Sequence, residues 1–139
     1  MEDINRREVL LIEDDRVDAL LVKKAFKSLS INNPVHHVEN GEEALEFLEN
    51  EENQEPWIIL LDINMPRMNG IEFLEVAKKH EKLKQIPVIV LTSSMEQRDR
   101  FDAYNFGVAG YMIKPVTYDD LLKMMDAIKM YWSMSKLPY

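Results

Sequence analysis

Charged and hydroxyl side chains follow four short apolar runs of the sequence, at the point where each run ends. In chain order they are Glu13–Asp15, Asp62, Thr92 and Lys114. Carboxylates held close together repel one another unless a cation lies between them, and oxygen ligands of this kind suit Mg²⁺. A lysine and a hydroxyl beside them can bind and neutralise an anion. The set therefore indicates a phosphoryl-handling site with an aspartate nucleophile.

These side chains can meet only if the apolar runs are strands of one sheet. The runs are Val9–Ile12, Val35–Val38, Trp57–Leu61, Pro87–Leu91 and Gly110–Ile113. Their short length and branched residues are typical of strands buried on both faces of a parallel sheet. In such a sheet, functional residues collect at the carboxyl ends of the strands, which is where the charged residues stand.

Apolar residues recur at helical spacing between and after these runs. The predicted helices extend from Arg16 to Leu29, from Gly41 through Leu48, from Ile71 through Ala77, after Ser94 to Phe106, and after Thr117 to Trp132. Asn40 with Glu43, and Ser94 with Gln97, have the spacing of helix capping boxes, and we expect Thr117 to cap the last helix. The alternation predicts one α/β domain over residues 1–139, with helices on both faces of a doubly wound, five-stranded parallel sheet.

Composition narrows the range of partners. The 139 residues include 17 Lys and Arg against 25 Asp and Glu, a net charge of −8. Because an acidic chain repels phosphate backbones, we expect no nucleic-acid partner. Cysteine is absent, which excludes disulfides and thiol chemistry and agrees with a reducing cytoplasm. No apolar run approaches the ~20 residues of a membrane span, so we expect no membrane association.

Each candidate residue also has an ordinary structural explanation when it is taken alone. Glu13–Asp15 could be the acidic first turn of a helix, which the helix dipole favours. Asp62 and Thr92 could cap a loop or a turn, and Lys114 could be a solvated surface lysine. The coincidence of complementary chemistry at four strand ends favours the functional interpretation.

The residues themselves resemble a known family. The chain is similar to the receiver domains of bacterial response regulators in two-component systems, on segments in the family order: 9–15, 60–66 with Gly70, 87–94 and 110–115. Certain further features resemble those of stand-alone regulators that partner cyanobacterial phytochromes. They are Asp18, the loop 50–56, Ala103-Tyr104 and Tyr131-Trp132. The resemblance implies the flavodoxin-like receiver fold, with strand order 2-1-3-4-5.

The resemblance also assigns roles at the phosphorylation site. Asp62 would accept the phosphoryl group, and Asp14 would bind Mg²⁺ directly, with Glu13 acting through water or weakly. Asp62 and the backbone carbonyl of Asn64 would complete the protein's share of the metal shell. Asp15 lies one position beyond the acidic pair of the family, so we leave it out of the site.

Further roles concern the response to phosphorylation. Thr92 would hydrogen-bond the phosphoryl group, and Lys114 would pair with Asp62 or a phosphoryl oxygen. Tyr111 would be the switch residue that changes rotamer when Thr92 moves. The Lys114–Pro115 peptide bond would be cis.

These assignments imply a signalling switch and not an enzyme acting on other substrates. A histidine kinase or phosphotransfer protein would phosphorylate Asp62. We expect no attached output domain, so the chain would act through a downstream protein partner. An aspartate-based phosphohydrolase is disfavoured because Asn64 stands where such enzymes carry a second acid. A flavin carrier is disfavoured because Glu13–Asp15 would repel the flavin phosphate. A receiver that acts without phosphorylation is disfavoured because Asp62, Thr92 and Lys114 are all present with Asp14.

The last helix carries two apolar stripes where one would suffice for packing. Leu121, Met125, Ile128 and Trp132 fit the side that faces the core, whereas Met124, Ala127, Tyr131 and Met134 form a second stripe. Uncovered apolar surface of this kind marks a contact site. We expect a homodimer through the last helix and its neighbours. The alternative is that the tail, 135–139, folds back over the second stripe.

Overall fold

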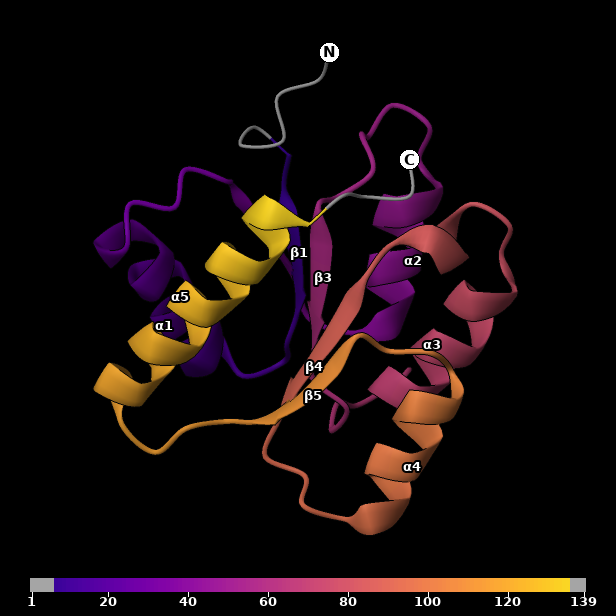
Figure 1. The fold of residues 1–139 in the computed structure, drawn as a ribbon. Coiled ribbons are helices and arrows are strands. Elements are labelled where there is room, and N and C mark those ends of the chain that lie inside the picture. The colour runs from indigo at the N-terminus through magenta and orange to yellow at the C-terminus, as the bar shows by residue number, and fades with distance from the viewer. Residues whose placement is uncertain (1–6, 136–139) are drawn as a thin grey trace.

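Parallel strands form a single sheet in the computed structural model, which describes residues 7–135 (Figure 1). Over these residues the sheet has five strands in the order β2-β1-β3-β4-β5. They are β1 (Val9–Ile12), β2 (Val35–Val38), β3 (Ile58–Leu61), β4 (Val88–Thr92) and β5 (Gly110–Ile113). Every neighbouring pair is parallel. The predicted fold class and strand order are confirmed, and the strand bounds agree with the sequence to within one residue.

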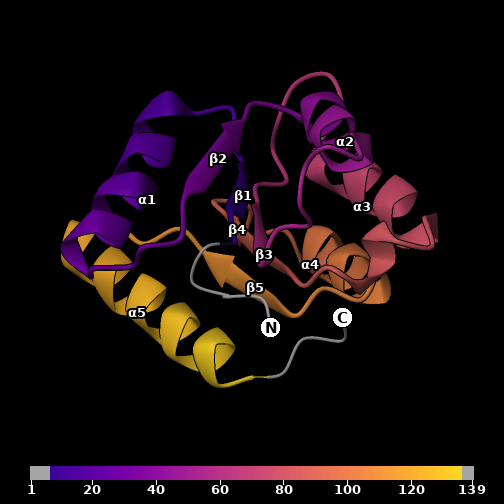
Figure 2. The ribbon, with the colours of Figure 1, turned by 90° about the horizontal axis from the view of Figure 1, so that it is seen from above.

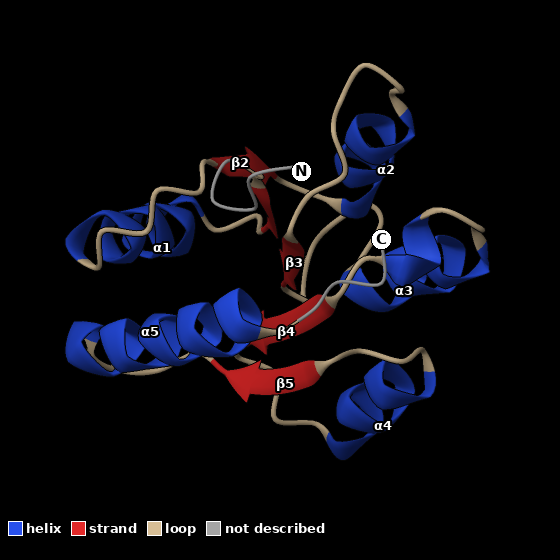
Figure 3. Cartoon of the chain, turned by 45° about the horizontal axis from the view of Figure 1, so that its top comes forward, coloured by secondary structure: helices blue, strands red, loops and turns tan. Residues whose placement is uncertain are grey.

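Helices cover both faces of this sheet (Figures 2 and 3). One face is covered by α1 (Arg16–Ser28) and α5 (Tyr118–Met134), and the other by α2 (Gly41–Glu49), α3 (Gly70–Lys79) and α4 (Gln97–Asn105). A short 3₁₀ helix, η2 (Leu83–Gln85), precedes β4. No helix among residues 7–135 is long and apolar enough to cross a membrane.

The core lies on both sides of the central strands. All residues of β1 and β3 are buried, because alternate side chains of a strand point to opposite faces and both faces are covered by helices. One apolar cluster joins the sheet to α2, α3 and α4, and a second joins it to α1 and α5. The two clusters hold the carboxyl ends of the strands at one edge of the sheet.

Two of the three predicted helix caps are confirmed. The Asn40 side chain accepts a hydrogen bond from the Glu43 backbone N–H, and the Thr117 side chain accepts one from Asp120 N–H. The capping box of Ser94 with Gln97 is wrong: α4 begins at Gln97 after Glu96, without a side-chain cap. The Ser94 hydroxyl donates to the carboxylate of Asp99 and accepts a hydrogen bond from the backbone N–H of Glu96 at 3.4 Å, so it does not cap Gln97.

The two stripes of α5 differ in burial as the spacing predicts. Leu121, Met125 and Ile128 are buried, whereas Tyr131 is 65% and Met134 is 82% exposed. Tyr131 and Met134 of the second stripe are therefore uncovered by the residues that the structure describes, whereas Met124 is half-buried and packs against the core. Residues 136–139 of the tail lie outside those residues, so the alternative that the tail covers the stripe stays open.

Candidate functional site

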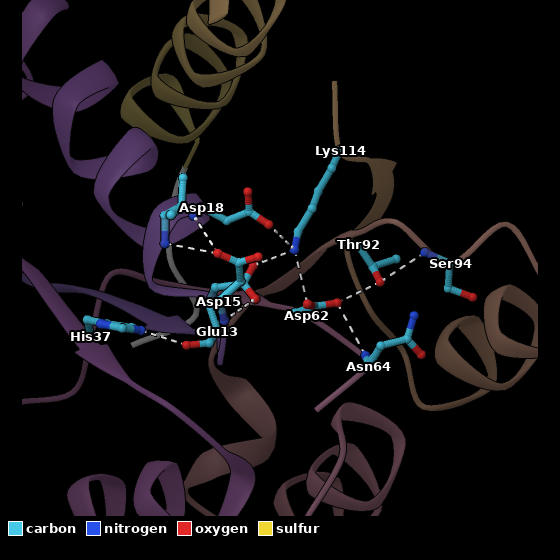
Figure 4. Close-up of polar contacts among 10 residues, drawn as sticks. Glu13, Asp15, Asp18, His37, Asp62, Asn64, Thr92, Ser94 and Lys114 are labelled. Atoms are coloured by element: carbon cyan, nitrogen blue, oxygen red, sulfur yellow. Dashed lines mark hydrogen bonds and ion pairs between the residues drawn. The ribbon is translucent and has the colours of Figure 1, made fainter. Parts of the chain in front are cut away.

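The carboxylate of Asp62 lies at the centre of the site, directly after β3 (Figure 4). Asp62 is only 4% exposed, and its backbone N–H donates a hydrogen bond to Ile12 O at 3.0 Å. The backbone at Asp62 also meets the start of α3, where a Cβ on Gly70 would come within 2.6 Å of Asp62 O and 2.7 Å of Ile63 Cα. Only glycine allows this close approach, which fixes where β3 ends.

Both carboxylate oxygens of Asp62 are engaged. The Thr92 hydroxyl donates to Oδ1 at 2.6 Å and the Asn64 backbone N–H donates to the same oxygen at 3.2 Å. The Lys114 ammonium donates to Oδ2 at 3.1 Å. The side chains expected at the ends of β3, β4 and β5 therefore do converge on one carboxylate.

Lys114 is surrounded by negative charge. Its Nζ lies 2.7 Å from a carboxylate oxygen of Glu13, 2.7 Å from one of Asp18 and 3.1 Å from Asp62 Oδ2, and its side chain is 17% exposed. Burial by itself would lower the pKa of Lys114, but the hydrogen bonds to Asp18 and Glu13 and the charge of Asp62 outweigh it and hold this pKa above its ordinary value. The ammonium therefore stays protonated at neutral pH.

Glu13 is the most deeply buried of the acids that follow β1. Burial, together with the nearby charge of Asp62, raises the pKa of Glu13 to about 8, although Lys114 opposes the shift. Its backbone is held as well, because the carbonyl oxygen accepts a hydrogen bond from His37 Nε2 at 2.6 Å. Two neighbouring carboxyl groups in a buried site resist being charged together, so a cation at this site would favour the ionised form of Glu13.

The acids form a group that fits a metal ion. One carboxylate oxygen from each of Glu13, Asp14 and Asp62 lies within 4.8 Å of the others. Glu13 and Asp62 are buried while Asp14 is exposed, which leaves the group open on one side for water or a phosphoryl oxygen. An all-oxygen donor set with an open side suits Mg²⁺ or Mn²⁺. Asn64 lies beside the group through its contact with Asp62; the role of its carbonyl stays a prediction.

A chain of hydrogen bonds leads from Asp62 toward α4 and β5. The backbone N–H of Ser94 donates to Thr92 Oγ1 at 3.2 Å, and the hydroxyl of Tyr111 donates to Ser94 O at 3.1 Å. Burial raises the pKa of Tyr111, so its hydroxyl remains a neutral donor. Tyr111 is thus tied to Thr92 through one residue, as a switch role requires, although the role itself stays a prediction.

One prediction from the resemblance is wrong. The described residues contain no cis peptide bond, so the Lys114–Pro115 bond is trans. Most X–Pro bonds are trans, because the trans form is favoured over the cis form by a small free-energy difference. The backbone N–H of Lys114 donates to Thr92 O at 2.8 Å, and the ammonium reaches Asp62 with this trans bond in place.

Sequence reasoning missed three contacts in and around the site. Asp15, left out of the acidic set, is the N-cap of α1, and its side chain accepts from Val17 N–H and Asp18 N–H. Ser94 bridges Thr92, Tyr111 and Asp99. Asp18 reaches Lys114 across 96 residues of sequence. The turn from β1 into α1 places Asp15 and Asp18, but no spacing rule pairs Asp18 with the lysine that follows β5.

Comparison with known proteins decides the family. Residues 9–126 match the model of the response regulator receiver domain. The chain belongs to this family. Receiver domains take phosphoryl groups from histidine kinases in two-component signalling, and the matched range contains every residue of the site described above.

Individual relatives agree with this assignment. The response regulator Rcp1 of Synechocystis is 36% identical over 128 residues, which are 89% of this chain and 87% of Rcp1. The phosphorylated cyanobacterial phytochrome response regulator RcpA has a similar structure, with a TM-score of 0.89, 31% identity and coverage of 96% and 99% of the two chains. The Mn²⁺-bound form of Rcp1 gives a TM-score of 0.86, with 35% identity and the same coverage.

Proposed function

We propose that this receiver domain is a phosphorylation-activated response regulator that accepts a phosphoryl group from a histidine kinase, or a phosphotransfer protein, on Asp62. The observation that carries the proposal is the environment of the Asp62 carboxylate. It is buried at the end of β3, with a hydroxyl at 2.6 Å from one oxygen and an ammonium at 3.1 Å from the other. Such donors stabilise charge on a transferred phosphoryl group.

The proposed reaction is a displacement at phosphorus. An oxygen of Asp62 attacks the phosphorus of a phosphohistidine, a P–O bond forms, and the P–N bond breaks with its electron pair returning to the imidazole nitrogen. The Lys114 ammonium and the Thr92 hydroxyl, now donors to Asp62, are placed to donate to phosphoryl oxygens. Mg²⁺, held by Glu13, Asp14 and Asp62 with the Asn64 carbonyl, would supply positive charge for these oxygens. The donor set and the Mn²⁺-bound form of Rcp1 support a divalent ion here.

The proposed output is a change of surface and not turnover of a substrate. Thr92, drawn to the phosphoryl group, would release the Ser94–Tyr111 arrangement and alter the face formed by α4, β5 and α5, where a downstream protein partner or a second copy would bind. Local charge events act in this way when they bias an element with two arrangements. We also propose a cytoplasmic location, which the absence of cysteine supports.

Intact mass spectrometry after treatment with acetyl phosphate and Mg²⁺ tests the proposal. The wild-type chain should gain one phosphoryl group that hydroxylamine removes, and chelation of Mg²⁺ with EDTA should abolish the gain. Asp62→Asn should not be labelled, because an amide is not a nucleophile, whereas Asp15→Asn, a neighbouring acid outside the site, should be labelled. Labelling of Asp62→Asn to the wild-type level would overturn the assignment.

A further inference from the structure

Asp18 makes the most direct contact with the site among residues to which no role has been given. It lies in the first turn of α1, and its Oδ2 accepts a hydrogen bond from Lys114 Nζ at 2.7 Å (Figure 4). The contact is shorter than the 3.1 Å between Lys114 and Asp62. It joins α1 to the end of β5, across the site and outside the group of acids that fits a metal ion.

The ammonium of Lys114 has three N–H donors, and its carboxylate partners within residues 7–135 number three as well. Two of them, Glu13 and Asp62, belong to the group that fits a metal ion. A bound cation would compete with Lys114 for the oxygens of those two residues, and phosphorylation would bond one oxygen of Asp62 to phosphorus. Asp18 is then the one of these three partners that can keep its contact with Lys114 while Asp62 binds a metal ion or is phosphorylated.

The geometry points to Asp18 as a positioning residue, which holds the Lys114 ammonium over Asp62 before and during phosphoryl transfer. The inference rests on the proposed function and adds a residue to it. Asp18 does not touch Asp62, and it acts through Lys114. A lysine is a flexible point charge on a long stem, so its contribution to a transition state depends on how well its position is fixed.

The surroundings of Lys114 show why such a residue is needed. A cavity of about 70 Å³ lies beside it, between α1 and the loop that connects β5 to α5, and both Lys114 and Asp18 line it. This volume is several times the ~10–15 Å³ that one water molecule requires. Without Asp18, the ammonium has space on this side in which to turn away from the phosphoryl group.

The ordinary explanation of Asp18 is a favourable acid in the first turn of a helix. That explanation predicts an effect of substitution on stability alone. The positioning role predicts an effect on the chemistry of Asp62 and on the state of the Lys114 amine, which the helix dipole does not control. The two explanations are therefore separable by experiment.

The first measurement is the rate of labelling by acetyl phosphate with Mg²⁺, followed by intact mass in the full chain. Asp18→Ala should lower this rate about tenfold, and Asp18→Asn, which keeps an oxygen acceptor, should recover most of the loss. The matched control is Glu39→Gln. It removes one carboxylate charge from a residue that follows β2 and is paired with Arg16 at 2.9 Å, without touching Lys114, and should label at the wild-type rate.

The second measurement needs neither metal nor phosphoryl donor. Acetic anhydride should acetylate Lys114 several times faster in Asp18→Ala than in the wild type, because the amine loses one of its three carboxylate partners, while other lysines and the Glu39→Gln control react as before. Peptide mass spectrometry gives the rate at each lysine. If Asp18→Ala does not fold, the same comparison is made with Asp18→Asn, which should show a smaller increase in the same direction.

The outcomes distinguish this inference from the proposed function. A wild-type chain that is labelled on Asp62 while Asp18→Ala matches it in both labelling and Lys114 reactivity would overturn the positioning role and leave the function intact. A wild-type chain that is never labelled would overturn the proposed function. Lower labelling in Glu39→Gln equal to that in Asp18→Ala would show a general charge effect and would also refute the positioning role.

Discussion

The two strands that carry the site differ sharply in their surroundings. β3 lies between β1 and β4, every one of its residues is buried, and it ends at Asp62. β5 is an edge strand with β4 as its partner, and its residues are half-buried or exposed. We call β1 and β3, with Glu13 and Asp62, the centre of the site, and β5, with α4 and α5, its edge.

We expect this difference to separate the residues that take part in phosphoryl transfer from the residues that rearrange in response to it. Asp62, the proposed phosphoacceptor, lies where the core is most completely buried, so its carboxylate keeps one position relative to Thr92 and Lys114. Tyr111 lies on the strand with the least cover, where a side chain can change its position without opening the core. Elements with few buried contacts are the ones that rearrange at low cost. The comparison therefore predicts that substitutions at the centre affect stability strongly and those at the edge affect it weakly.

The largest effect is expected for Gly70→Ala at the centre. Its Cβ would meet backbone atoms of Asp62 and Ile63 at 2.6 and 2.7 Å, and backbone in a packed core cannot move away cheaply. We expect the free energy of unfolding, measured with urea, to fall by about 2–4 kcal/mol.

Gly110→Ala on β5 is the matched substitution at the edge. The nearest atom to its Cβ would be Ile89 Cγ2 at 3.9 Å, an ordinary contact, so the free energy of unfolding should change by less than about 1 kcal/mol and can rise. Equal losses in the two variants would refute the distinction between centre and edge.

A smaller effect is expected from the titration of Glu13. Its folded pKa of about 8 lies above the ordinary value of 4.5, so the folded chain keeps a proton that the unfolded chain releases. The protonated Glu13 contributes fully to the free energy of unfolding below its unfolded pKa, and this contribution is lost as the pH rises toward 8. Between pH 6 and pH 8 without metal, the wild type should lose about 1–2 kcal/mol of unfolding free energy relative to Glu13→Gln.

Tyr111, at the edge of the site, provides the control for this pH dependence. The pKa of Tyr111 is raised above its ordinary value of 10.0, so this hydroxyl does not titrate between pH 6 and pH 8. Tyr111→Phe should therefore change stability by the same amount at both values. A wild-type stability that is flat with pH, or parallel to that of Glu13→Gln, would show that Glu13 is already ionised in the folded chain.

The sequence predicts the centre better than the edge, and for a physical reason. Strands buried on both faces require continuous apolar runs, so β1 and β3, and the acids that follow them, are visible in the sequence. Parallel pairing then brings Asp62, Thr92 and Lys114 together without further information. The convergence of these residues could be predicted, and the structure agrees.

The contacts that the sequence did not reveal are those between side chains of distant elements. Asp18 pairs with Lys114 because α1 passes the end of β5, and this depends on how the helices pack on the sheet. The false capping box at Ser94 is a local error. A serine followed three residues later by glutamine fits the pattern, but α4 begins at Gln97 itself, and the Ser94 hydroxyl donates to Asp99, five residues further along the chain. The capping pattern alone does not determine at which residue a helix begins.

The smallest effect on stability is expected at the edge, on the second stripe of α5. Met134→Glu with Tyr131→Glu should change the free energy of unfolding by less than about 0.5 kcal/mol, since both side chains are exposed and surface substitutions rarely do more. We expect the same pair of charges to abolish a homodimer, because an exposed apolar stripe is a contact surface and a two-fold contact would place the charges near their own copies. Light scattering at micromolar concentration, with and without beryllofluoride, measures the change.

Val17→Glu is the control for this last variant. Val17 on α1 is 64% exposed, against 65% for Tyr131, so it adds a charge at an equally exposed apolar position away from the edge and should leave the dimer intact. Loss of the dimer in both variants would indicate a general effect of charge on association. A wild-type chain that stays monomeric in both states would rule out the homodimer, and the stripe would then serve another partner or be covered by the tail.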